Sequence, residues 1–101
     1  PDDNKTVTPE LIMDIVSDHF GVSIADLKSN KRPAEIAVPR QIVMYLCGDM
    51  TSESLQNIGK ALGGRDHTTI IHGTKKIASE LKTDENLKNT IDILKKKINP
   101  Q

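Results

Sequence analysis

Residues 63–72 of this chain read GGRDHTTIIH, a run in which the end of one segment is followed at once by the start of a helix. Two adjacent glycines end the preceding segment, and Asp66 has a side chain of the kind that caps the first turn of a helix. That first turn carries His67, Thr68 and Thr69 and no bulky apolar residue. We therefore predict a helix whose amino end faces solvent and presents short hydrogen-bonding side chains.

The helix that begins at Asp66 is predicted to reach about Lys82, because apolar residues recur along it at helical spacing. Its inward-facing residues are predicted to be Ile70, Thr74, Ile77, Ala78 and Leu81. The helix before it is predicted to be capped by Thr51 or Ser52. Its inward residues are predicted to be Leu55, Ile58 and Leu62. Two helices joined by a glycine-containing turn form a helix-turn-helix, in which the amino end of the second helix enters a DNA groove.

Helical patterns also fill most of the remaining chain. Four further helices are expected, over about residues 8–21, 23–28, 39–50 and 84–98. Residues 29–39 contain two prolines and no helical stripe, so we predict a loop with a basic tip there. Pro39 is predicted to begin the helix that follows, since proline is well tolerated in the first helical turn. The predicted fold class is all-α.

Length and composition are those of one small domain. The 101 residues include 36% hydrophobic and only 2% aromatic residues, so the core is expected to be aliphatic and aromatic platforms for single-stranded nucleic acid are excluded. We expect residues 1–7 to be a linker remnant, residues 8–98 the domain and residues 99–101 a tail. Because the sequence begins Pro-Asp-Asp-Asn, without an initiator methionine, it is expected to be a piece of a longer protein.

Several other functional classes find no support in the residues. The single cysteine, Cys47, lies in an apolar run, so we expect a small buried side chain, no disulfide framework and a cytoplasmic protein. No run approaches the ~18 apolar residues of a membrane span. His67 and His72 would lie about 140° apart around a helix, so they are not expected to share a metal ion. Since no glycine-rich phosphate loop is present, neither a cofactor nor ATP hydrolysis is expected in this piece.

The charges of the chain are unevenly distributed. The 14 basic and 14 acidic residues give zero net charge, but residues 1–27 hold five more acidic than basic side chains. Residues 28–76 hold four more basic than acidic ones, and residues 77–101 hold one more. Screening limits the reach of a charge to about 8–10 Å, so phosphates respond to the local excess. Because this excess coincides with the predicted helix-turn-helix, double-stranded DNA is the expected partner.

The first turn of the reading helix suits the edges of base pairs in a major groove. Thr68 and Thr69 each offer a hydroxyl group and a methyl group that can pack on thymine, and His67 can donate to guanine. Asp66 can accept from a cytosine amino group, or it can serve only as the helix cap. Both roles stay open on the sequence alone.

Other basic and polar residues are expected to contact the DNA backbone. Arg65 is expected on a phosphate, although an ion pair with a neighbouring acid is the alternative, and at least one of Lys75 and Lys76 should also face the backbone. Arg40 and Gln41 lie near a predicted helix start, where free amides and the helix dipole favour phosphate.

These residues resemble the C-terminal DNA-binding domain of the DnaA family of bacterial replication initiators. The matching stretches are GGRDHTTIIH, KKI at 75–77, PRQ at 39–41 and ADL at 25–27, and the resemblance runs from about Thr8 to Ile98. It implies an all-α, Trp-repressor-like helix-turn-helix that binds DnaA boxes, asymmetric elements similar to TTATCCACA, at a replication origin. It also implies a monomeric domain, ATP chemistry in a separate domain, and regulators of replication as further partners.

The resemblance also implies individual contacts. Residues that match positions 66–69 read bases in the major groove, and the arginine that matches Arg32 enters the adjacent minor groove. Contacts to the sugar-phosphate backbone are implied for Arg40, Gln41, Leu55 and Lys76. Gln56 is expected to be a further backbone contact, although a proline is common at its position in the family.

Two rival classes of function can be separated by experiment. A phosphodiesterase built on His67 would need a metal ion or a second histidine nearby, and a nuclease assay with added metal ions would reveal it. A protein-interaction module would use the helix-turn-helix surface or the acidic N-terminal helix. Such a module should not distinguish a DnaA-box duplex from a scrambled one.

Overall fold

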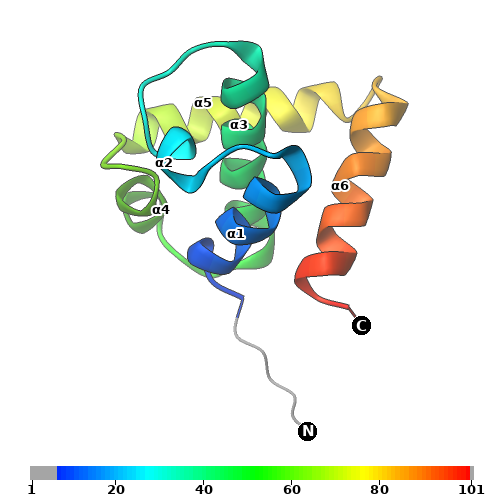
Figure 1. Cartoon of the computed structure of the whole chain (residues 1–101), viewed down its shortest axis with the longest axis horizontal. Helices are drawn as coiled ribbons and strands as arrows, with labels where there is room; N and C mark the ends of the chain where they lie inside the picture. The colour runs from blue at the N-terminus through cyan, green and yellow to red at the C-terminus, as the bar shows by residue number, and fades with distance from the viewer. Residues whose placement is uncertain (1–6, 101) are drawn as a thin grey trace, which may run out of the picture.

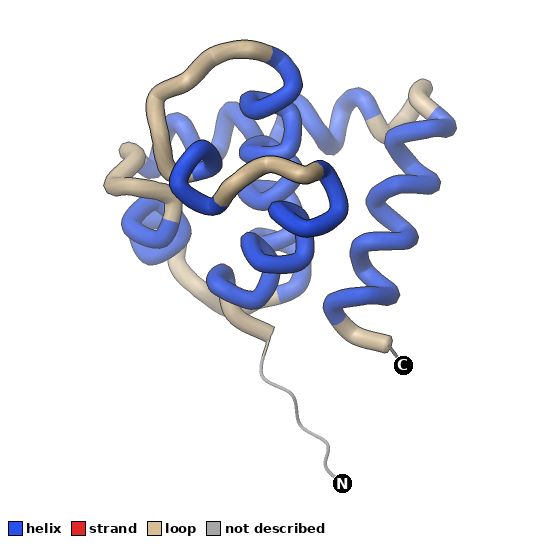
Figure 2. Tube along the Cα trace, in the orientation of Figure 1, coloured by secondary structure: helices blue, strands red, loops and turns tan. Residues whose placement is uncertain are grey.

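The computed structural model describes residues 7–100, which contain six helices and no strand (Figures 1 and 2). The helices are α1 (Pro9–Phe20), α2 (Ile24–Leu27), α3 (Ala34–Met50), α4 (Leu55–Ala61), α5 (His67–Glu80) and α6 (Glu85–Ile98). The prediction of an all-α fold with about six helices is confirmed. Of the predicted linker, residues 1–6 lie outside the described part, and Val7 packs against the core.

Side-chain caps fix the start of several helices. Thr8 accepts a hydrogen bond from the Leu11 amide at 3.1 Å, and Pro9 occupies the first position of α1, as the sequence predicts. The same arrangement recurs at α2 and α6, where the caps are Ser23 and Asp84. Each cap satisfies an amide of the first turn that has no partner within the helix.

α3 begins earlier than the sequence predicts. Its first residue is Ala34, so the second half of the predicted loop 29–39 is helical and Pro39 lies inside the helix. Pro33 ends the loop, and its carbonyl accepts from the amides of Ile36 and Ala37 at 2.9 and 2.8 Å. Pro39 removes only the bond to the Glu35 carbonyl, which belongs to an exposed residue where solvent can replace the missing donor.

α4 begins later than the sequence predicts. Thr51 does not cap it but ends α3, where its amide and its hydroxyl both donate to the Cys47 carbonyl. The cap of α4 is Ser54, which accepts from the Asn57 amide at 3.1 Å. The helix-turn-helix therefore consists of a 7-residue α4 and a 14-residue α5, both shorter than predicted.

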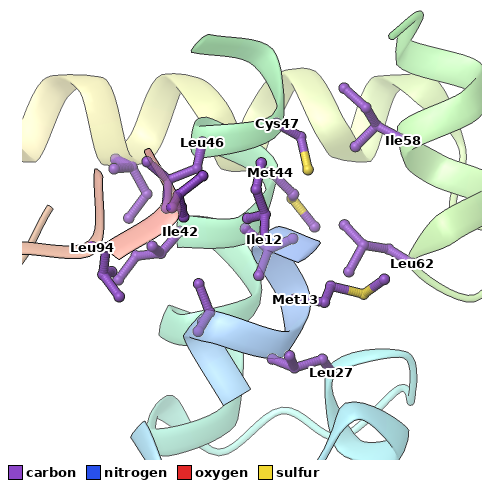
Figure 3. Packing of buried hydrophobic residues seen from close by; sticks show 14 of the residues in the cluster. Ile12, Met13, Leu27, Ile42, Met44, Leu46, Cys47, Ile58, Leu62 and Leu94 are labelled. Atoms are coloured by element: carbon purple, nitrogen blue, oxygen red, sulfur yellow. The ribbon is translucent and has the colours of Figure 1, made fainter. Parts of the chain in front are cut away.

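The core gathers around α3, which runs through the centre of the bundle (Figure 1). Figure 3 shows apolar side chains from several helices meeting there, and Ile12, Leu46, Cys47 and Leu94 are fully buried. Of the eight predicted inward-facing residues, Ile58, Leu62, Ile70 and Ile77 are buried, and Thr74 and Leu81 are half-buried. Two predictions are wrong: Ala78 is exposed, and Leu55 is 39% exposed because α4 begins at this residue and its first turn projects beyond the bundle.

A glycine lets α5 pack closely across α3. Gly73 is buried, and a Cβ atom at this position would lie 2.3 Å from Met44 Sδ and 3.4 Å from Gln41 Cγ. Because no side chain intervenes, the two helices approach closely at Gly73. The exposed residues of α5 on either side of this contact lie near α3. No helix within residues 7–100 is long and apolar enough to cross a membrane.

Candidate nucleic-acid interface

The amino end of α5 projects into solvent. His67, Thr68 and Thr69 are exposed, whereas Ile70 is fully buried. Packing of the helix on the core therefore begins at its fourth residue, which leaves the whole first turn outside. This is the geometry that the sequence predicts for a helix end that enters a groove of DNA.

Asp66 occupies the cap position of α5 but does not cap it with its side chain. Its backbone is extended, with φ −65° and ψ 147°, yet its carboxylate makes no hydrogen bond to the first-turn amides. Instead Asp66 Oδ1 lies 3.2 Å from His67 Nδ1, and the two side chains are 67% and 54% exposed. The expectation of a side-chain cap is wrong, because the carboxylate has turned toward the imidazole. In the first turn the Thr69 amide donates to the Asp66 carbonyl at 3.0 Å instead.

A groove of about 400 Å³ lies along the line where α5 packs on α3. Thr69, His72 and Lys76 contribute to it from α5, since positions three and four residues apart share one face of a helix. The residues that line it are Ala37, Arg40, Gln41, Met44, Arg65, Thr69, His72, Gly73 and Lys76. The structure therefore brings a predicted base reader together with four of the predicted backbone contacts.

Gln41 lines this groove from α3. Its Oε1 atom is buried and has no hydrogen-bond partner among the described residues. The other end of the amide, Nε2, is a donor, and a phosphate oxygen only accepts hydrogen bonds.

Arg40 lies beneath the groove rather than on the surface. It is 7% exposed, and three of its N–H groups donate to backbone carbonyls at 2.9 Å. The carbonyls belong to Asp26, Leu27 and Lys31. Burial lowers the pKa of its guanidinium, and the charge of Asp26 opposes that shift. Arginine titrates so far above neutrality that the charge remains. The predicted phosphate contact would have to use its two remaining N–H groups.

Arg65 is also engaged within the protein. It donates through Nη1 to the Leu62 carbonyl and through Nη2 to the Ser29 carbonyl. Burial lowers the pKa of its guanidinium, and the positive charge of Arg40 lowers it further. The alternative ion pair with an acidic neighbour is not formed among the described residues, and the phosphate contact stays a prediction. Two guanidinium groups nevertheless concentrate positive charge at one end of the groove.

The remaining predicted contacts fall on three separate surfaces. Arg32 is exposed on the loop 28–33 and does not line the groove between α3 and α5. This position is compatible with the minor-groove contact expected for it. Lys75 is exposed but lies about 100° from Lys76 around the helix, so only Lys76 faces the groove. Leu55 and Gln56 line a separate hollow of about 200 Å³, together with Ser54 and His67.

His72 is the groove residue for which the sequence analysis assigned no DNA contact. It is exposed and lines the groove between α3 and α5. Its spacing from Thr69 and Lys76 places all three on one helical face, a signal that was present in the sequence. Within residues 7–100 no three His, Cys, Asp or Glu side chains gather closely enough to hold a metal ion.

Comparison with known proteins gives one consistent result. The family described as "Bacterial dnaA protein helix-turn-helix" matches residues 9–77. The chromosomal replication initiator protein DnaA of Lachnoclostridium phytofermentans is 52% identical over 100 residues, 99% of this chain and 22% of the relative. The proteins of the same name from Geobacter sulfurreducens and Geobacter metallireducens are 46% and 50% identical over 95 residues, 94% of this chain and 21% of each relative. The chain thus spans about a fifth of the length of these relatives.

Proposed function

Since this chain belongs to the bacterial DnaA helix-turn-helix family, we propose that it binds double-stranded DNA at DnaA-box elements similar to TTATCCACA. The observation that carries this proposal is the exposed first turn of α5, with His67, Thr68 and Thr69 outside and Ile70 fully buried. A turn of this kind offers hydroxyl, methyl and imidazole groups to base edges, and the groove beside it offers donors to a phosphate.

The proposed contacts are of two kinds, to bases and to the DNA backbone. Residues 67–69 read bases in the major groove, and the carboxylate of Asp66, free of its capping role, accepts from a base amino group. Arg32 reads the adjacent minor groove from its loop. Gln41, Lys76 and His72 contact phosphates along the groove between α3 and α5, and the backbone contacts proposed in addition are Arg40, Leu55, Gln56, Arg65 and Lys75.

The wider role that we propose is origin binding that supports the initiation of chromosomal replication. The relatives bear the name chromosomal replication initiator protein, which supports this role. We further propose that the domain acts as a monomer in the bacterial cytoplasm without a cofactor of its own, and that regulators of replication are additional partners. ATP binding and hydrolysis would belong to another part of a longer protein.

A direct titration tests the proposal. Fluorescence anisotropy should show tighter binding to a labelled box duplex than to a scrambled duplex of equal length, by a factor of about 10³ or more at moderate salt. Equal affinity for the two duplexes would contradict sequence-specific recognition, and it would favour a protein-interaction module instead.

A further inference from the structure

The loop that joins α2 to α3, residues 28–33, is tied directly to the turn between α4 and α5. Arg65 belongs to that turn and donates to the Ser29 carbonyl of the loop, while its other terminal nitrogen donates to the Leu62 carbonyl. In Figure 1 the loop that leads from α2 into α3 passes beside the turn between α4 and α5, in agreement with these bonds. One guanidinium group therefore bridges two segments that lie 36 positions apart in sequence.

A glycine of the same turn packs against the loop. Gly63 has φ +86°, and a Cβ atom there would lie 2.3 Å from the carbonyl oxygen of Lys28. The backbone of the turn thus touches the backbone of the loop, with no side chain between them. Such a contact leaves little freedom in the separation of the two segments.

Arg40 holds the base of the loop from the other side. Its three hydrogen bonds to carbonyls lie within residues 26–31, and its own position is fixed because it is buried in α3. Arginine is suited to this task because its planar group presents five donors in a rigid fork, whereas a lysine ammonium cannot serve carbonyls in such a spread. The other side-chain bonds of the loop are local. Lys31 pairs with Asp26 at 2.8 Å, and the Ser29 hydroxyl donates to the Asp26 carbonyl and accepts from the Lys31 amide. None of them reaches the turn between α4 and α5.

We propose that Arg40 and Arg65 are positioning residues that hold the loop bearing Arg32 at a fixed distance from the exposed start of α5. The inference rests on the proposed DNA-binding function and goes beyond it, because it concerns how two reading elements are kept in register. A duplex presents its major and minor grooves at a fixed separation, so a preorganised pair of readers avoids the loss of conformational entropy on binding. In this role the two arginines act through Arg32 and contact no base. The phosphate contacts proposed for them above are a separate role.

A double-mutant cycle separates positioning from a direct phosphate contact. In the wild-type background, Arg32→Ala should weaken binding to the box duplex by about tenfold. In an Arg65→Met background the same change should cost less than about threefold, because a loosened loop no longer holds Arg32 in the groove. Thr69→Ala should cost about tenfold in both backgrounds, which shows that recognition by α5 is intact. Equal penalties for Arg32→Ala in the two backgrounds would overturn the inference and would fit independent phosphate contacts.

Loop mobility in the free protein gives a readout that does not depend on DNA. The ¹⁵N order parameters of Lys31 and Arg32 should be near 0.85 in the wild-type domain and should fall below about 0.6 in Arg65→Met. The matched control is Lys88→Met, which removes an exposed cation of α6 and should leave the loop unchanged. Unchanged order parameters in Arg65→Met would refute the positioning role. If the wild-type domain failed to prefer the box duplex, the proposed function would fall, and the order parameters would still decide whether Arg65 holds the loop.

Discussion

Replacement of Gly63 by alanine tests how tightly the helix-turn-helix packs on the loop 28–33. The backbone of Gly63 has φ +86°, a conformation that costs a residue with a Cβ atom about 1–2 kcal/mol. The new Cβ atom would also lie 2.3 Å from the Lys28 carbonyl oxygen, about 1.1 Å short of the 3.4 Å at which ordinary contact begins. Because that oxygen belongs to the backbone, relief requires movement of the loop, and overpacking of this kind costs about 1–3 kcal/mol.

The neighbouring glycine provides a matched control. Gly64 has the same φ of +86°, but a Cβ atom there would meet nothing within 4 Å. Gly64→Ala should therefore lower the free energy of unfolding by about 1–2 kcal/mol, from backbone conformation alone. Gly63→Ala should lower it by about 2–5 kcal/mol, and the difference between the two variants isolates the contact with the loop.

Urea unfolding followed by far-ultraviolet circular dichroism measures both free energies by linear extrapolation. The expected losses lie within the roughly 5–15 kcal/mol that stabilises a domain of this size, so both variants should have a folded baseline. Equal losses for Gly63→Ala and Gly64→Ala would show that the turn and the loop are not in close contact.

Three further predictions follow from the site and the core. His67→Ala and Thr69→Ala should each weaken binding to the box duplex by about 1–3 kcal/mol and change binding to random DNA little, as measured by anisotropy; equal losses on both duplexes would remove them as base readers. Lys76→Ala should weaken binding to both duplexes and lower the slope of log K against log salt by about one, whereas an unchanged slope would place Lys76 away from phosphate. Burial raises the pKa of Cys47 from 9.0 to about 12, so only the unfolded state loses the thiol proton as the pH rises above 9. The stabilising effect of the protonated thiol is complete below about pH 9 and is lost progressively up to about pH 12. Cys47→Ala should consequently lose less stability than the wild type over that range in urea titrations, and parallel curves would contradict a buried thiol.

The helical architecture could be predicted from the sequence where local chemistry determines it. Thr8-Pro9 and Asp84 are caps whose partners lie three residues away, so the local sequence is sufficient. The start of α3 could not be placed, because Pro39 is a strong local signal for a helix start. In the folded chain the helix begins before it and tolerates one missing hydrogen bond on an exposed side.

Some features of the candidate site also follow from the local sequence, and others do not. Exposure of residues 67–69 follows from where the apolar stripe of α5 begins, which the sequence displays. The positions of Arg40 and Arg65 do not follow from the sequence. Their partners are backbone carbonyls of distant residues, and every residue has a backbone carbonyl, so the sequence does not identify the partner. A surface role was therefore the natural expectation for both. For His72 the sequence does contain a signal, because positions 69, 72 and 76 share one face of a helix.

We propose that the amino end of α5 and the loop 28–33 together face one DNA duplex. Backbone amide chemical shifts, followed while a box duplex is added to ¹⁵N-labelled protein, test this most directly. We expect the largest changes within residues 30–41 and 52–76, with His67 to Thr69 among them, and smaller changes with a scrambled duplex. Changes concentrated on α1 and α6, with residues 67–69 unaffected, would contradict it.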